Sequence, residues 1–165
     1  MIIRAETPAD AAGIRAIVSA AFAGDQEADL VDDLRRDGDL LLSMVADDSG
    51  ALVGHIAFSR VWISHQARRT PAVSLAPLAV VPDHGRRGIG GALVEAGHAG
   101  LRAAGESIIF VLGDPAYYSR FGYTLSAAAA FDCVYGGPHF QALVLTEVAP
   151  KAGAITYAAA FGRLQ

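Results

Sequence analysis

The stretch that decides the fold is VVPDHGRRGIGGALVEAG, residues 80–97. It begins as the end of an apolar strand and ends as a helix rich in small residues, with glycines and two arginines in between. A helix N-terminus offers unpaired backbone N–H groups and the positive end of the helix dipole. Glycines let that backbone approach a ligand without Cβ atoms in the way. The segment therefore predicts a phosphate-binding turn, to which Arg86 and Arg87 would add charge-assisted hydrogen bonds.

Two common nucleotide-binding motifs do not fit these glycines. A P-loop needs a lysine directly after its last glycine, and the only lysine of the chain is Lys151. A dinucleotide fingerprint counted from Gly88 places Leu93 in its last glycine slot. The alternative is a tight strand–helix turn in which glycine only relieves crowding.

Pro77 lies just upstream, inside the predicted strand 72–81. Proline cannot donate a hydrogen bond to a sheet, so the strand is expected to bulge or to separate from its neighbour there. A separated strand leaves N–H and C=O groups with which an extended, amide-bearing ligand can pair. Together with the glycine turn, this feature favours a long ligand with a phosphate head and an amide tail.

The rest of the chain alternates between strand and helix patterns. Strands are predicted at 2–5, 39–46, 51–63, 72–81, 107–112, 123–127 and 140–146. Helices are predicted from Thr7 to Phe22, at 26–36 and at 88–104, with a short helical piece at 114–122 and a loop at 68–71. This order indicates an α/β (α+β) protein with one domain over residues 1–165.

Composition narrows the class of protein. The chain is 53% hydrophobic and 18% charged, which is typical of a well-filled core. Its net charge of −4 argues against nucleic acid or an anionic membrane as a partner. A single cysteine, Cys133, excludes an internal disulfide. The N-terminal residues lack a signal-peptide pattern, and no apolar run reaches the length of about 18 residues that a membrane-spanning helix needs. We therefore expect a cytoplasmic protein.

Three motifs together resemble the GNAT superfamily of N-acetyltransferases, and within it the YhbS-like branch. They are LAPLAVVPDHGRRGIGGALVEAG (75–97), SIIFVLGD (107–114) and YYSRFGY (117–123). The resemblance is dense from 74 to 124 and continues in order elsewhere, as in GHIAFS (54–59). It implies a mixed central sheet of about seven strands, parted between strands 4 and 5 and flanked by about four helices.

The resemblance also implies acetyl-CoA as co-substrate, bound between strands 4 and 5 without a metal. By position, the pantetheine arm would pair with the backbone of Leu78, Ala79 and Val80. The pyrophosphate would be held by Arg86, Arg87, Gly88, Ile89, Gly90 and Gly91. The Gln/Arg slot of the family pattern is occupied by Gly85, with Arg86 one place later.

The sequence also contains candidate catalytic residues. The match to YYSRFGY implies that Tyr118 protonates the departing CoA thiolate. Tyr117, also a candidate for cofactor binding, is the alternative, since either ring could face the opening. The attacking amine must be neutral, and an alkylammonium with a pKa of about 10.4 needs a base to become so. The candidates are Glu27, otherwise a helix-start charge, and His55, otherwise a hydrogen-bonded sheet histidine.

The sequence therefore predicts an acetyl-CoA-dependent N-acetyltransferase that acts by direct transfer. The alternatives are transfer of a longer acyl chain from acyl-CoA or acyl carrier protein, and a CoA-binding sensor module without turnover. The acceptor is expected to be an amine of a small molecule, a peptide or a protein. By analogy with similar folds, the chain is expected to form a homodimer.

Overall fold

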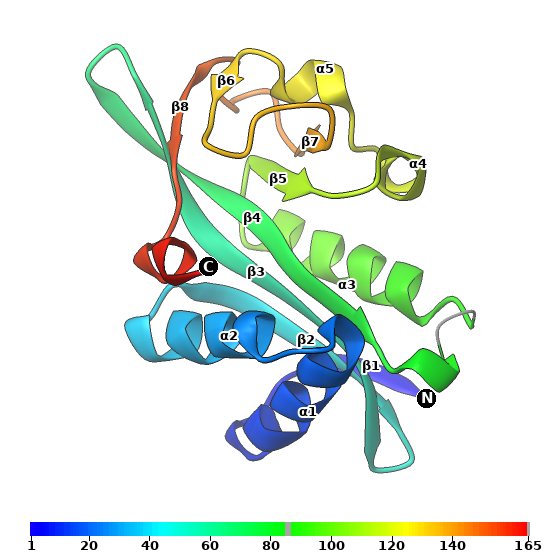
Figure 1. The fold of residues 1–165 in the computed structure, drawn as a ribbon. Coiled ribbons are helices and arrows are strands. Elements are labelled where there is room, and N and C mark those ends of the chain that lie inside the picture. Colours follow the sequence, from blue (N-terminus) through cyan, green and yellow to red (C-terminus); the bar gives the residue numbers. More distant parts are fainter. Residues whose placement is uncertain (85–86, 165) are drawn as a thin grey trace.

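The computed structural model describes residues 1–84 and 87–164. Its centre is a twisted eight-stranded sheet in the order β1-β2-β3-β4-β5-β7, with β8 pairing with both β3 and β6 (Figure 1). The strands are β1 (Ile2–Ala5), β2 (Leu40–Asp48), β3 (Ala51–His65), β4 (Arg68–Val80), β5 (Ile108–Leu112), β6 (Phe131–Asp132), β7 (Phe140–Val144) and β8 (Gly153–Thr156). The sheet is mixed. From β1 to β4 each strand is antiparallel to the next, whereas β4 and β5 are parallel.

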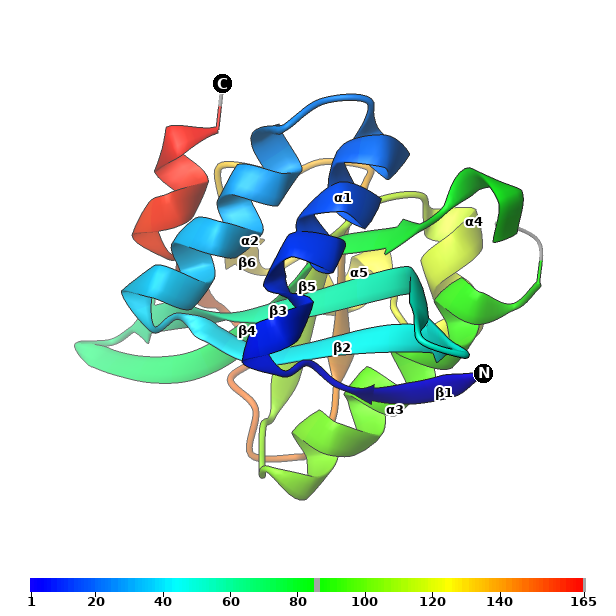
Figure 2. The ribbon, with the colours of Figure 1, turned by 90° about the horizontal axis from the view of Figure 1, so that it is seen from below.

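Helices cover both faces of this sheet. α1 and α2 lie on one face and α3 on the other (Figure 2). The helices are α1 (Ala11–Phe22), α2 (Gln26–Asp37), α3 (Ile89–Ala103), α4 (Pro115–Tyr118) and α5 (Leu125–Ala128). Short 3₁₀ turns are η1 (Pro8–Asp10), η2 (Pro82–His84), η3 (Ser119–Phe121) and η4 (Ala159–Arg163), of which η4 packs against α2. None of the helices in the described part of the chain is long and apolar enough to span a membrane.

Two predicted segments differ from the structure. Residues 68–71 are not a loop but the start of β4, because the hairpin turn is made by Gln66 and Ala67 at φ values of +49° and +63°. The predicted strand 123–127 is wrong. Thr124 makes only a single bridge to Ala142, and its hydroxyl then accepts the N–H of Ala127 at 3.0 Å to begin helix α5. The N-capping side chain of Thr124 therefore favoured a helix over the strand that the sequence pattern indicated.

The sheet opens at Pro77, as predicted. Opposite β3, Leu75 pairs with Phe58 and Leu78 with Ile56, so Ala76 and Pro77 form a bulge against one intervening residue. On the other side, β4 pairs with β5 only through Val73, Ser74 and Leu75. Beyond the bulge the two strands part, as expected for strands 4 and 5.

Helix α3 lies closest to a core ring of the sheet at Gly97. A Cβ added there would collide with Cε2 of Phe58, a fully buried ring of the main core. By contrast, a Cβ at Gly100 on the same helix would meet mainly the end of the half-buried Leu42 side chain. The distance from α3 to the sheet, and hence the position of its N-terminus, depends on Gly97.

We expect Gly97→Ala to lower the free energy of unfolding by about 1–3 kcal/mol, because the buried ring has no space into which to move. Gly100→Ala is the matched control, in which the higher helix propensity of alanine is gained with little crowding. Urea unfolding of both variants measures the difference. Equal stabilities would contradict the close approach of α3.

Candidate active site

The N-terminus of α3 forms a cradle of backbone N–H groups. Gly88 precedes the helix at φ +73°, a left-handed conformation that favours glycine. Regular i to i−4 bonding starts where Ala92 N–H donates to Gly88 O at 3.0 Å. Within the described residues, no acceptor is found for the N–H groups of Ile89, Gly90 and Gly91. The local sequence thus produces a helix start with unpaired N–H groups, the kind of end that suits an anion.

The cradle opens into a cavity of about 390 Å³ lined by Leu78, Val80, Gly88, Gly90, Gly91, Tyr117 and Arg120. Arg120 comes from η3 and brings a cation that the sequence analysis did not assign to the site. In the sequence, Arg120 is the arginine of YYSRFGY. It was matched to the family motif there without a role in the site. A Cβ at Gly90 would lie 2.7 Å from the Tyr117 hydroxyl, so this glycine makes room for the ring that closes the cradle.

One of the two predicted arginines lies within the described residues. Arg86 lies outside the described residues. Arg87 is exposed, and its N–H donates to His84 O at 3.3 Å, so this amide bonds within the preceding turn. Arg87 is therefore placed to act through its side chain rather than its backbone.

The edge of β4 beyond the bulge provides further backbone groups. Val81 N–H donates to Val53 O at 2.9 Å, which defines a hydrogen-bonded pair with β3. Because successive residues of an antiparallel strand point their N–H and C=O groups to opposite sides, Ala79 also bonds toward β3. Leu78 and Val80 point theirs toward the gap left by β5. Of the three predicted residues, these two offer free backbone groups.

The loop after β5 positions the paired tyrosines. Asp114 caps α4, since its carboxylate accepts the N–H of Ala116 at 2.9 Å. Gly113 is held by His139 O, at 2.9 Å from its N–H, and by the Gln141 amide, at 3.1 Å from its carbonyl. A Cβ at Gly113 would lie 2.5 Å from Tyr118 Cε2, so the glycine of LGD lets this ring lie against the backbone.

Tyr117 and Tyr118 face different cavities. Their rings are nearly perpendicular, at 86° with centroids 5.0 Å apart. Tyr117 lines the cradle, whereas Tyr118 lines a second cavity, here called the aromatic cavity. Burial raises the pKa of Tyr118 to about 12. Its hydroxyl is therefore a hydrogen-bond donor throughout the physiological range.

The aromatic cavity has a volume of about 400 Å³ and lies where β4 and β5 part. Its floor is the β4 bulge, from Ser74 to Leu78. Its walls come from α1, α2, the end of β5, α4, the loop between β6 and β7 and the C-terminal segment: Phe22, Glu27, Leu30, Leu112, Gly113, Asp114, Tyr118, Tyr135, Tyr157, Phe161 and Leu164. The C-terminal part of the wall, Tyr157, Phe161 and Leu164, lies far along the chain from the motifs, and sequence reasoning did not assign it to the site.

The two candidate bases are separated by the fold. Glu27 lines the aromatic cavity with Tyr118. His55 does not line it, and its ring is fully buried, with Nε2 2.8 Å from Ser43 Oγ. Burial lowers the pKa of His55 to about 4, so the ring is neutral at pH 7. The structure brings Glu27 and Tyr118 together and places His55 in the packed layer beneath α1 and α2.

Buried neutral histidines predict acid sensitivity. Burial also lowers the pKa of His98 to about 4, and its Nε2 lies 2.8 Å from the Tyr123 hydroxyl. In the unfolded chain a histidine protonates near pH 6.5, so between pH 6.5 and 4 the unfolded state binds more protons. The free energy of unfolding should therefore fall as the pH drops through this window, by up to about 3 kcal/mol per histidine.

Urea unfolding at pH 7, 6 and 5 measures this slope. His55→Gln should flatten it, whereas His65→Gln, at the exposed end of β3, should leave it unchanged. A slope that survives intact in His55→Gln and in His98→Gln would refute the assignment.

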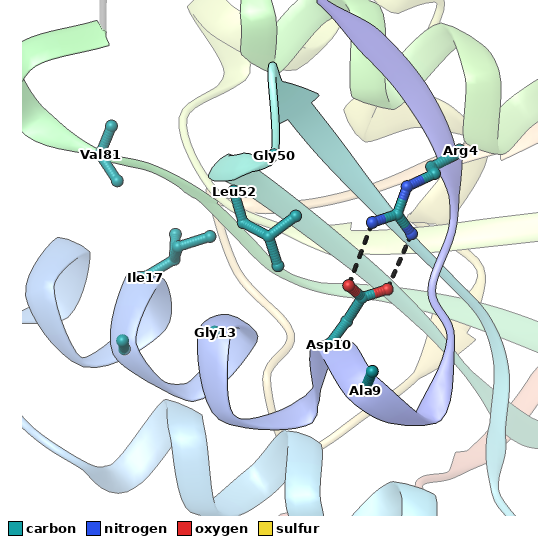
Figure 3. A pocket seen from close by; sticks show the side chains of 9 residues that line it. Arg4, Ala9, Asp10, Gly13, Ile17, Gly50, Leu52 and Val81 are labelled. Carbon is teal, nitrogen blue, oxygen red and sulfur yellow. Dashed lines mark hydrogen bonds and ion pairs between the residues drawn. The ribbon is translucent and has the colours of Figure 1, made fainter.

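A further cavity of about 470 Å³ lies between α1 and the β2–β3 hairpin (Figure 3). Its charged groups already bind one another. Arg4 contacts Asp10 at 2.8 Å and Asp47 at 3.2 Å, and this pairing holds the pKa of Asp10 well below its usual range. The remaining wall is made of small and aliphatic side chains. No free polar group there suggests chemistry, and in the described part of the chain no cluster of three metal-ligating side chains occurs.

A sheet that parts beside a glycine-rich helix start, with a half-buried tyrosine at the opening, defines an acetyltransferase of the GNAT kind. Comparison with protein families agrees, since the acetyltransferase (GNAT) domain model matches residues 2–126, and the chain belongs to this family. It is 44% identical to the uncharacterized N-acetyltransferase YhbS of Escherichia coli K12 over 138 residues, covering 83% of this chain and 81% of the relative.

Solved structures agree with the family. The chain matches the crystal structure of Escherichia coli YhbS in complex with CoA, with a TM-score of 0.91 and 38% identity over 99% of this chain and 93% of that one. It matches a GNAT acetyltransferase from Brucella melitensis in complex with acetyl-CoA, with a TM-score of 0.82 and 38% identity over 97% of both chains. The likeness therefore extends beyond the motif region to nearly the whole chain.

Proposed function

We propose that this protein transfers the acetyl group of acetyl-CoA directly to an amine. The observation that carries the proposal is that two cavities of different chemistry share one wall. Leu78 lines both the N–H cradle at α3 and the aromatic cavity that contains Tyr118 and Glu27. The CoA and acetyl-CoA complexes of the two similar GNAT proteins support the same assignment.

The described residues fit acetyl-CoA. The first-turn N–H groups of Ile89, Gly90 and Gly91, with the dipole of α3, suit the pyrophosphate. Arg120 adds a charge from the opposite wall. The backbone of Leu78 and Val80 suits the amides of the pantetheine arm. The exposed Arg87 would add a side-chain contact at the outer rim. Arg86 stays a candidate by resemblance alone.

Tyr118 stabilises the leaving group in this proposal. Acetyl-CoA supplies a thioester, and cleavage of its C–S bond leaves a thiolate. A phenol with a pKa of about 12 would transfer its proton to a thiolate, whose thiol has a pKa of about 8.5, only at a cost of about 5 kcal/mol. Tyr118 therefore acts by donating a hydrogen bond to the developing negative charge.

In this proposal, Glu27 accepts a proton from the attacking amine. An alkylammonium must lose a proton before its nitrogen can form the new C–N bond. Glu27 is the candidate base that the fold places in the aromatic cavity, where it would accept that proton directly or through water. His55 has no place in this scheme, because its ring is enclosed in the core.

Two measurements test the proposal. Calorimetry with acetyl-CoA should give micromolar binding, and a mixture of primary amines should produce amine-dependent release of CoA thiol. Binding without release by any amine would indicate a sensor module instead. Faster release from octanoyl-CoA than from acetyl-CoA would indicate a longer-chain acyltransferase. Absence of binding would refute the proposal.

We also infer the setting in which the protein acts. Residues 1–165 would form one domain, because β1 and β8 belong to the same sheet, and a single unfolding transition would support this. Cys133, half-buried and the only cysteine, suits the reducing cytoplasm. A homodimer, expected by analogy with similar folds, is tested by light scattering of the purified chain.

A further inference from the structure

We infer that the acceptor is a small primary amine with a single positive charge on an apolar body, such as an arylalkylamine or alkylamine. This inference rests on the proposed function and concerns the aromatic cavity. Three observations carry it: the apolar walls, the single uncommitted carboxylate and the size of the space.

The walls offer apolar surface from the floor to the mouth. Tyr135, Tyr157 and Phe161 line the cavity. At the mouth, Phe22 remains 42% exposed and Leu112 51% exposed, although both are large apolar side chains that line the same cavity. Exposed apolar groups that continue a cavity wall are typical of a binding site for an apolar ligand.

Part of the polar lining of the cavity is already hydrogen-bonded within the protein. The Tyr157 hydroxyl accepts from Cys133 Sγ at 3.7 Å, and the Gly113 carbonyl accepts from the Gln141 amide at 3.1 Å. Apart from the carboxylates, the polar side chains of the lining are the hydroxyls of Ser74 and the tyrosines. An acceptor with many hydroxyls, such as an amino sugar, would therefore lose more bonds to water than this lining replaces.

The charge of the cavity matches one ammonium group. Glu27 and Asp114 are its lining carboxylates, and that of Asp114 caps α4 through the N–H of Ala116. In the described part of the chain, Glu27 makes neither an ion pair nor a side-chain hydrogen bond. The faces of neighbouring tyrosines attract a cation as well. A polyamine would bring further charges that nothing here neutralises.

The size of the cavity favours a small molecule. Its volume of about 400 Å³ lies near the lower end of the range for small-ligand sites, about 300–1,000 Å³. A lysine on a folded protein would also set a polar surface against the exposed Phe22 ring. We therefore assign the site to a free amine.

The experiment compares acceptors by kcat/KM at saturating acetyl-CoA. Straight alkylamines from propylamine to heptylamine should gain about fourfold per methylene until the cavity is filled. 2-Phenylethylamine should exceed spermidine, kanamycin and an N-acetylated lysine peptide. A higher kcat/KM for any of these three would overturn the inference while leaving the proposed acetyltransferase intact. Bound acetyl-CoA with no acetylation of any amine would refute the proposed function itself.

Glu27 needs a test that separates recognition from proton transfer. Phenylethyl-trimethylammonium carries the charge but has no proton to lose, so its inhibition constant reports recognition alone. Glu27→Gln should raise that constant about fivefold, whereas Glu147→Gln, at an exposed position outside the cavity, should not. Acetyl-CoA affinity should be unchanged in both. An unaltered inhibition constant in Glu27→Gln would remove ammonium recognition from this residue.

Two matched variants test the apolar mouth of the cavity. Leu112→Asp should abolish the gain per methylene, while Val148→Asp, at a position that is 83% exposed and outside the cavity, should preserve it. An alkylamine series that is flat in the wild type, or unaffected by Leu112→Asp, would overturn the assignment of the mouth to the apolar body.

Discussion

Replacing Gly90 with aspartate is expected to weaken acetyl-CoA binding by about 1,000-fold. The reason is electrostatic, because two unit charges about 4 Å apart near a protein surface interact by about 4 kcal/mol. The new carboxylate would enter the cavity in which the N–H groups of α3 and Arg120 favour an anion. Its Cβ would also displace the Tyr117 hydroxyl, which lies 2.7 Å from that position. Calorimetry with acetyl-CoA measures the loss.

Gly90→Asn separates charge from volume. Asparagine has nearly the same shape as aspartate, so it should crowd Tyr117 equally but cost only about tenfold in affinity. The thermal unfolding of both variants should stay near that of the wild type, since Gly90 lies in the first turn of α3, away from the core. Equal losses in the two variants would mean that the cradle does not hold an anion.

The second large effect is expected for Tyr118→Phe. Loss of a hydrogen bond to a developing thiolate costs about 1.5–3 kcal/mol, so kcat should fall by about 10- to 100-fold. The KM for acetyl-CoA should change little, because the hydroxyl binds the charge that develops only during the reaction. Single-turnover release of CoA thiol measures the step without interference from product release.

Tyr117→Phe is the matched control, one residue away and facing the other cavity. It should alter acetyl-CoA affinity more than kcat, because Tyr117 lines the cradle. The pH profile adds an independent check. With the Tyr118 pKa at about 12, the wild-type kcat should show no loss from this group up to pH 10. A larger kcat effect in Tyr117→Phe would reverse the roles of the two tyrosines.

Features that depend on neighbouring residues were predictable from the sequence. The glycines before α3, the bulge at Pro77 and the Pro115 start of the short helix after β5 all follow from φ preferences and missing donors. Apolar periodicity placed α2 correctly because its buried side chains recur at helical spacing. The strand predicted at 123–127 was wrong because a single N-capping hydroxyl, on Thr124, decided that segment.

The sequence by itself thus determined the family, the glycine-rich start of α3 and the opening of the sheet, since each is encoded in short local motifs. Only the tertiary structure decided where the candidate catalytic residues lie. It turned Tyr118 toward the aromatic cavity and Tyr117 toward the cradle, and it enclosed His55 while leaving Glu27 at the cavity. The physical reason is that burial and side-chain direction depend on packing between segments far apart in the chain. The spacing of residues within one segment carries no information about that packing.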